Sequence, residues 1–217
     1  MSFHKRITKK TNCGIGFVSE PERLSLIHNP SCAAAIWRRK PLTSFQNWID
    51  AQAPEKLPSA RMILSPERVT NALTNLVDLS GLSNCIERNL LVEDVSALAQ
   101  IFANIMQVAY LRLRLQVVSS NACHKFHIDS LKARLICTYR GTGTQYGTSE
   151  NGTNPYEISD LPTGSVMIMR GTLWPENPMT GLLHRSPPIE GTGETRLVLV
   201  LDPIEDLDEE LDENILH

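Results

Sequence analysis

The chain has 217 residues, of which 41% are hydrophobic and 21% charged, with a formal net charge of −3. These values are typical of one globular unit and exclude a fibrous or intrinsically disordered chain, and the negative balance argues against nucleic acid as a partner. No apolar run approaches the ~20 residues that a membrane-spanning helix needs, and the basic N-terminal residues are not followed by the apolar stretch of a signal peptide. Five scattered cysteines, an odd number without a C-x-x-C pair, suit free thiols. We therefore expect a cytoplasmic protein with no membrane partner; the sequence gives no indication of oligomeric state.

Helices dominate the predicted elements of the first half of the chain. Residues 24–27 favour a short strand, and residues 33–37 form a second apolar run after an Asn-Pro turn. Helical spacing of apolar residues predicts helices over 43–52, 66–80 and 93–110, the second with Ser65 as its capping residue and Pro66 at its first position. We expect residues 1–110 to form a mostly helical region that supports a β domain.

From residue 111 the apolar period changes from helical to two. The predicted strands are 111–118, 125–129, 133–140, 156–159, 165–170, 181–185 and 195–201. Several short strands separated by Gly, Pro and Asn favour a β-sandwich or jelly roll. The predicted fold class is therefore α+β, with residues 111–202 as the β core and the tail 203–217 as part of the same structural unit.

The stretch that organises these predictions contains His127 and Asp129. Alternate residues of a strand project from the same face, so the imidazole and the carboxylate would lie about 6–7 Å apart along the strand and could converge on one metal ion. His184 lies in a later short segment and would supply a third ligand from a neighbouring strand. Two histidines and one carboxylate on one side of an ion form the arrangement used for non-haem Fe(II) oxygen chemistry. The structural alternative for each residue alone is a buried histidine in a satisfied hydrogen-bonded pair.

The order of these residues resembles the Fe(II)/2-oxoglutarate-dependent dioxygenase superfamily over roughly residues 111–202. The likeness consists of His-x-Asp at 127–129, a distal His184 in a His-Arg-x-x-Pro setting, and Arg196 on the next strand. Residues 161–169 resemble the family's strand after a Pro/Gly turn, whereas residues 141–147 depart from its Gly-Gly-x-Leu turn. The resemblance implies a double-stranded β-helix, a jelly-roll variant. It also implies an oxygenase of hydroxylase type that uses Fe(II), 2-oxoglutarate and O₂.

Within this resemblance, Arg196 is the expected clamp for the far carboxylate of 2-oxoglutarate. A guanidinium presents a planar fork that matches a carboxylate, and an unpaired arginine pointing inward from an apolar strand would otherwise be costly. The alternative is an outward-pointing Arg196 that pairs with Glu194 on the surface. Tyr139 and Thr138, which end the preceding strand, are candidate hydrogen-bond donors to the oxo acid or else pack in the core.

Cys123 and His124 add two more metal-binding side chains to the same segment. A thiolate with imidazoles suits Zn²⁺, and the Irving–Williams order favours zinc over ferrous iron at many such sites. On a regular strand Cys123 would share the side of His127 and His124 would face away, and Cys123 could equally pack as a small apolar residue. A zinc-binding jelly-roll protein involved in metal handling, without oxygenase activity, is therefore the alternative hypothesis.

Three further segments have two interpretations each. Residues 141–147 form either a lid near the predicted site or a plain surface turn. Trp174 either walls the substrate space or packs in the core. Residues 202–213 hold eight acidic residues and no basic one, which indicates an exposed acidic tail or an interaction tail. In the second case a degenerate member of the fold would bind a partner through this tail.

Overall fold

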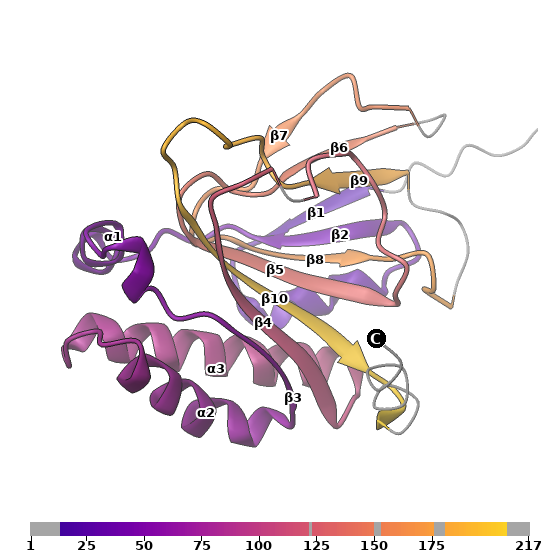
Figure 1. Cartoon of the computed structure of the whole chain (residues 1–217). Coiled ribbons are helices and arrows are strands. Elements are labelled where there is room, and N and C mark those ends of the chain that lie inside the picture. The colour runs from indigo at the N-terminus through magenta and orange to yellow at the C-terminus, as the bar shows by residue number, and fades with distance from the viewer. Residues whose placement is uncertain (1–13, 122, 150–152, 176–180, 208–217) are drawn as a thin grey trace, which may run out of the picture.

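Two β-sheets and a layer of helices make up the computed structural model, which describes residues 14–121, 123–149, 153–175 and 181–207 (Figure 1). The strands of the larger sheet are β1 (Gly14–Val18), β2 (Cys32–Trp37), β3 (Ala60–Leu64), β4 (Tyr110–Val118), β5 (Ala133–Arg140), β8 (Val166–Arg170) and β10 (Arg196–Ile204). Their spatial order is β1-β2-β8-β5-β10-β4-β3, and all neighbours are antiparallel except β1 and β2. The smaller sheet has the order β7-β6-β9, formed by β6 (Gln145–Thr148), β7 (Ser159–Asp160) and β9 (Leu182–Arg185).

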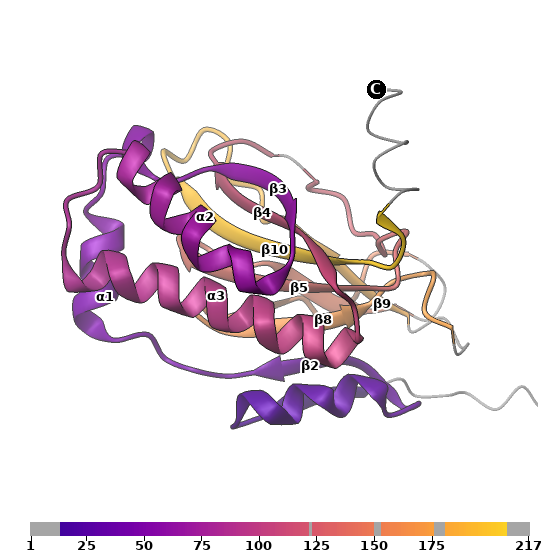
Figure 2. The ribbon, with the colours of Figure 1, turned by 90° about the horizontal axis from the view of Figure 1, so that it is seen from below.

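The helices cover one face of the larger sheet, and the smaller sheet lies over the opposite face (Figures 1 and 2). The helical elements are α1 (Thr43–Asp50), α2 (Pro66–Leu79) and α3 (Ile86–Met106), with two 3-10 segments, η1 (Pro21–His28) and η2 (Pro54–Lys56). We call the two faces of the larger sheet the helix face and the inner face. Within the described residues, no helix is long and apolar enough to cross a membrane.

The predicted helices over 43–52 and 66–80 are confirmed to within two residues. The third helix begins at Ile86, seven residues before the predicted start, and it ends at Met106 because Gln107 adopts a left-handed conformation with a φ of 56°. Residues 24–27 are part of η1 and not of a strand. They pack through Leu24 and Ile27, which are fully buried.

The prediction of a mostly helical first half is incomplete, because β1, β2 and β3 complete both edges of the larger sheet. β2 was hard to assign as a strand because it contains three consecutive alanines, which have a weak preference for strands. All of Cys32–Ile36 is buried, since η1 packs near one face of β2 and the inner core lies on the other. Small side chains fit this covered position.

Strand alternation gives the two faces of the larger sheet different chemistry. On β4, Leu111, Leu113 and Leu115 are fully buried against the helices. The intervening residues, Arg112 and Arg114, therefore project from the inner face. On β10 the leucines at 197, 199 and 201 repeat this pattern, so that the polar residues of the strand also lie on the inner face.

Two predicted strands differ in the structure. Residues 125–129 contain only an isolated bridge at His127, and the predicted strand 156–159 is reduced to the short β7. The smaller sheet instead uses β6, which takes in residues 145–147 of the loop predicted as a lid or surface turn. Because Gln145 to Thr148 pair with β9, this part of the loop is held in the sheet and is not a lid.

The start of the predicted acidic tail is structured. Asp202 is only 2% exposed and lies in β10, where its carboxylate pairs with arginines. Glu205 forms an ion pair with Lys132. Residues 208–217, which hold most of the predicted tail, lie outside the described residues.

Candidate metal centre

The backbone brings His127 and His184 side by side. The N–H of His127 donates to the carbonyl oxygen of His184 (3.1 Å), and the N–H of His184 donates to that of His127 (3.0 Å). Residues that exchange both hydrogen bonds are directly opposite each other in an antiparallel pair, so that their side chains share a face. The two imidazole centroids are accordingly 4.5 Å apart.

Asp129 completes the cluster. Its Oδ1 lies 3.6 Å from Nε2 of His127, and its Oδ2 lies 3.1 Å from Nε2 of His184. One ligand atom from each of the three residues lies within 4.8 Å of the others. Two atoms bound next to each other on one ion at about 2.1 Å would be about 3 Å apart, so these separations suit a shared divalent cation. The structure thus brings together the three predicted metal ligands, although through a single bridge and not through a regular strand.

Two observations support a cation between these groups. Nδ1 of His127 lies 2.8 Å from the carbonyl oxygen of Lys125, and a proton on this nitrogen leaves the lone pair of Nε2 directed at the cluster. Oδ2 of Asp129 is buried and accepts no hydrogen bond from any described residue, despite its closeness to His184. A buried carboxylate oxygen without a donor is suited to a metal ion, and the residues present therefore fit a two-histidine, one-carboxylate centre.

Charge also favours the ligand form of Asp129. Burial opposes ionisation of this carboxyl group, but its contacts with His127 and His184 and the charge of Arg134 hold the pKa of Asp129 well below its usual range. The same contact with Asp129 raises the pKa of His127, although burial opposes the shift. Arg134 forms an ion pair with Oδ1 of Asp129 and so fixes the orientation of the carboxylate.

Gly171 fixes the backbone that carries Asp129. Its N–H donates to the carbonyl oxygen of Lys132, and the N–H of Thr172 donates to that of Asp129, both at 2.9 Å. A Cβ atom at position 171 would lie 1.9 Å from the carbonyl oxygen of Leu131 and 2.7 Å from that of Asp129. Only glycine permits this close approach. Neither Gly171 nor Arg134 was singled out from the sequence, because their roles depend on segments that meet only in the fold.

Arg196 is buried and points inward, not outward beside Glu194. It is 1% exposed, its Nε donates to the carbonyl oxygen of Thr142 (2.6 Å), and its Nη2 lies 3.4 Å from Oγ1 of Thr138. Glu194 instead accepts hydrogen bonds from the N–H and hydroxyl of Thr142. Burial lowers the pKa of Arg196 to about 10 against the attraction of Glu194. Arg196 lines a cavity of about 80 Å³ together with His127 and His184.

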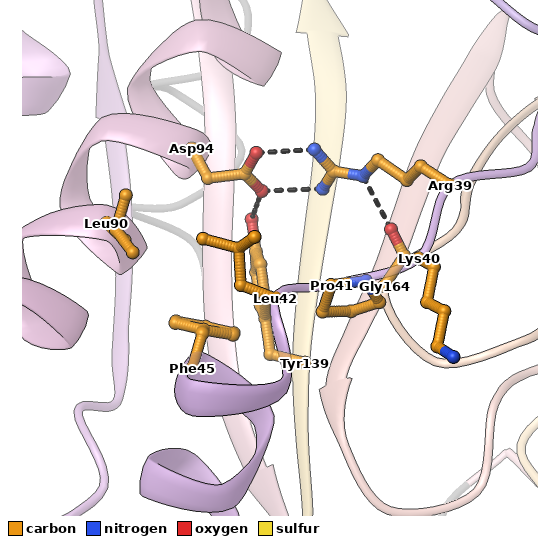
Figure 3. A pocket seen from close by; sticks show the side chains of 9 residues that line it. All are labelled: Arg39, Lys40, Pro41, Leu42, Phe45, Leu90, Asp94, Tyr139 and Gly164. Carbon is orange, nitrogen blue, oxygen red and sulfur yellow. Dashed lines mark hydrogen bonds and ion pairs between the residues drawn. The ribbon is translucent and has the colours of Figure 1, made fainter.

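Tyr139 does not reach this cavity, because it follows Thr138 on β5 and therefore projects from the helix face. Its hydroxyl donates to Oδ2 of Asp94 (2.6 Å), and Asp94 also forms a two-pronged ion pair with Arg39. Figure 3 shows this group beside a second cavity, of about 160 Å³, next to α1 and α3. Of the two interpretations of Tyr139, the structure supports packing in the core and not contact with the oxo acid, whereas Thr138 lies beside Arg196.

The remaining candidates lie outside the three-residue cluster. Cys123 is exposed, with a φ of 53°; it lines the cavity but is not one of the three grouped ligands. His124 is exposed, and its Nδ1 lies 2.7 Å from the carbonyl oxygen of Asn121. Trp174 packs against Arg170, whose guanidinium lies 4.4 Å from the ring centroid, and so does not wall the cavity.

The fold is that of known dioxygenases. The structure of dioxygenase for auxin oxidation 1 from Arabidopsis thaliana, a binary complex with 2-oxoglutarate, matches 89% of this chain and 93% of its own length, with a TM-score of 0.55 and 12% identity. The rice dioxygenase for auxin oxidation matches 90% of this chain and 84% of its own, with a TM-score of 0.52 and 11% identity. At these identities the likeness concerns the fold.

A family model matches residues 18–202, and the chain belongs to that family, described as "Protein of unknown function (DUF1826)". A comparison with curated protein sequences found no match. The matched range takes in β2 to β10 together with the helices, and not only the predicted β core.

Proposed function

We propose that this protein is a non-haem Fe(II)- and 2-oxoglutarate-dependent oxygenase. The observation that carries the proposal is the convergence of His127, Asp129 and His184 at a cavity that also contains a buried Arg196. The dioxygenase fold of the chain supports it. The expected small molecules are 2-oxoglutarate, O₂ and a primary substrate.

Each residue has a distinct task in this proposal. His127, Asp129 and His184 would hold Fe(II) from one side, and Arg134 keeps the Asp129 carboxylate in place. Arg196 would pair with the far carboxylate of 2-oxoglutarate, with Thr138 as a neighbouring hydroxyl. When bound, the iron and the oxo acid supply oxygen activation and the two electrons that it requires. The protein contributes the position of these groups and a cavity that no acidic residue lines among the described residues.

The alternative of a thiolate zinc site gains no support from the described residues. Cys123 is exposed and lies outside the ligand group, so the cluster offers two nitrogen ligands and one oxygen ligand without sulfur. This donor set is the one associated with non-haem Fe(II) oxygenases. Zinc could also bind these three ligands, and metal analysis distinguishes it from iron.

The test begins with metal analysis of the full chain purified without chelators. After anaerobic reconstitution with Fe(II), addition of 2-oxoglutarate should produce a weak visible charge-transfer band, and exposure to O₂ should release succinate slowly. Stoichiometric zinc, no charge-transfer band and no succinate release would contradict the proposal.

Single variants link the activity to the cluster. His127→Ala, Asp129→Ala and His184→Ala should each lose Fe(II) binding while circular dichroism shows a folded chain. His124→Ala is the matched control, because His124 is exposed three residues before His127 and should leave Fe(II) binding unchanged. Iron retained by the three ligand variants would refute the assignment.

A further inference from the structure

Three arginines on the inner face surround one buried carboxylate beside the metal centre. Nη2 of Arg114 lies 2.9 Å from Oδ2 of Asp202, and Nε of Arg134 lies 2.6 Å from Oδ1. Nη1 of Arg112 lies 4.0 Å from Oδ2. Because Arg134 also pairs with Asp129, this group is continuous with the metal ligands. We call these three residues and Arg61, which lies on β3 opposite Arg114, the arginine cluster.

Like charges lie close together in the arginine cluster. Arg61 of β3 lies directly opposite Arg114 of β4, and like charges in this position destabilise a sheet. Arg112, Arg114 and Arg134 all lie within 4.0 Å of Asp202, and Arg134 also pairs with Asp129, the candidate metal ligand. Burial lowers the pKa of Arg114, and repulsion by the other three arginines lowers it further against the attraction of Asp202. An additional anion would relieve this repulsion.

The position of Arg114 places positive charge at the cavity of the candidate metal centre. Arg114 lines the same cavity as His127, His184 and Arg196, and no acidic residue lines that cavity among the described residues. Arg196 lies opposite Val118, whereas Arg114 lies four residues earlier on β4, about 13 Å along the strand. The buried Nε of Arg114 has no hydrogen-bond partner in the described part of the chain. Of the other arginines that line this cavity, Arg134 pairs with two carboxylates, and Arg185 donates to Gln145 and lies over the ring of Phe126. If Arg196 holds 2-oxoglutarate, we therefore assign Arg114 to a second anion.

We propose that the arginine cluster binds an oxyanion group, a carboxylate or a phosphate, of a small-molecule primary substrate, with Arg114 as its principal hydrogen-bond donor. This inference rests on the proposed function, since it assigns Arg196 to the co-substrate. A planar guanidinium matches both kinds of oxyanion. The small cavity, of about 80 Å³, favours a small molecule over a polymer.

The test measures binding of simple anions to the full chain loaded with Mn(II) and saturating 2-oxoglutarate. The probes are carbon-13-labelled acetate and inorganic phosphate, with acetamide as the neutral counterpart of acetate. Broadening of the carbon and phosphorus resonances by Mn(II) reports both affinity and closeness to the metal. We expect broadening by one or both anions and none of the acetamide carbonyl resonance. The anion that binds more tightly identifies the class of oxyanion.

Variants separate anion binding from a purely structural role. Arg114→Gln should weaken anion binding about tenfold or more, the loss of one charge-assisted hydrogen bond, and Arg114→Lys should weaken it less. Asp202→Asn should strengthen binding, because it removes a competing carboxylate, whereas a merely structural network predicts weaker binding. Arg88→Gln is the matched control, since Arg88 is also a buried arginine paired with an aspartate, Asp78, but lies in the helix layer.

The outcomes distinguish this inference from the proposed function. Equal anion affinity in the original chain and Arg114→Gln, or broadening by acetamide equal to that by acetate, would overturn the inference. If the chain binds no Mn(II), the proposed function fails. Isothermal titration of the metal-free chain with the same anions then decides whether Arg114 still binds them. If the chain binds the metal and 2-oxoglutarate but its anion binding does not depend on Arg114, this inference fails and the proposed function stands.

Discussion

Replacement of Arg196 tests the assignment of the co-substrate site most directly. Arg196→Met keeps the length of the side chain but removes the guanidinium fork, so that the far carboxylate of 2-oxoglutarate would lose charge-assisted hydrogen bonds worth about 1.5–3 kcal/mol. This loss corresponds to a weakening of 2-oxoglutarate binding by about tenfold to about 150-fold. The folded state should tolerate the change, because burial already disfavours the charged form of Arg196. Arg196→Lys should give an intermediate affinity, since it keeps the charge without the fork.

The assay is an anaerobic titration of Fe(II)-loaded protein with 2-oxoglutarate, followed by the charge-transfer absorption. Tyr139→Phe is the matched control, because Tyr139 is buried on the opposite face of the same sheet. It should leave 2-oxoglutarate affinity unchanged but remove the hydrogen bond to Asp94, which costs about 1 kcal/mol and lowers Tm by about 2–4 °C. Unchanged 2-oxoglutarate affinity in Arg196→Met would refute Arg196 as the clamp for 2-oxoglutarate. A loss of this affinity in Tyr139→Phe would contradict the placement of the co-substrate site on the inner face of the sheet.

Three further results are expected from local features. Gly171→Ala should weaken Fe(II) binding at least about tenfold, because the added Cβ would displace the backbone of Asp129. Gly14→Ala is the control, since its Cβ makes only an ordinary contact and Fe(II) binding should be normal. Equal Fe(II) affinities of the two variants in metal titrations would contradict the role of Gly171. Thiol labelling of the folded chain at pH 8, followed by peptide mass analysis, should modify exposed Cys123 and spare Cys137. The reason is that burial shields Cys137 and raises the pKa of its thiol to about 12. Early labelling of Cys137 would contradict its burial in the core. Asp94→Asn should lower Tm by more than Tyr139→Phe does, because it weakens the ion pair with Arg39 as well as the hydrogen bond from Tyr139. A smaller decrease of Tm in Asp94→Asn than in Tyr139→Phe would contradict this ranking.

The grouping of His127, Asp129 and His184 could be predicted from the sequence because their residue types and spacing carry the chemistry. The geometry that joins them was not predictable in the same way. His127 and Asp129 were expected on one face of a strand, but the structure aligns His127 with His184 through a single bridge and holds Asp129 through Arg134 and the backbone near Gly171. These contacts link segments far apart in the chain, so local patterns carry no signal for them.

The two interpretations of Tyr139 could have been separated from the sequence. Thr138 and Tyr139 are adjacent on a predicted strand, so strand alternation already implies that only one of them can face the site. The apolar residues at 133, 135 and 137 share the face of Tyr139 and indicate the core side of β5. The core position of Tyr139 was therefore available from the sequence. The inner-face position of Asp202 was not, because the predicted strand 195–201 ends one residue before it and Asp202 was grouped with the acidic residues that follow.

The alternation of leucine and arginine on β4 connects the fold to the proposed chemistry. Its leucines build the helix-face core, and the same period of two places Arg112 and Arg114 on the inner face, where Arg114 lines the cavity of the candidate metal centre. On a solvent-facing strand, water and salt would screen the charge of these arginines. On the inner face the arginines lie next to Asp202 and the candidate ligands, where screening is weaker. A divalent ion at Asp129 would add to the positive field, so that anions entering the cavity are favoured once the metal is bound. The arrangement would therefore couple a bound metal to both anionic ligands that we propose, 2-oxoglutarate at Arg196 and an oxyanion at Arg114.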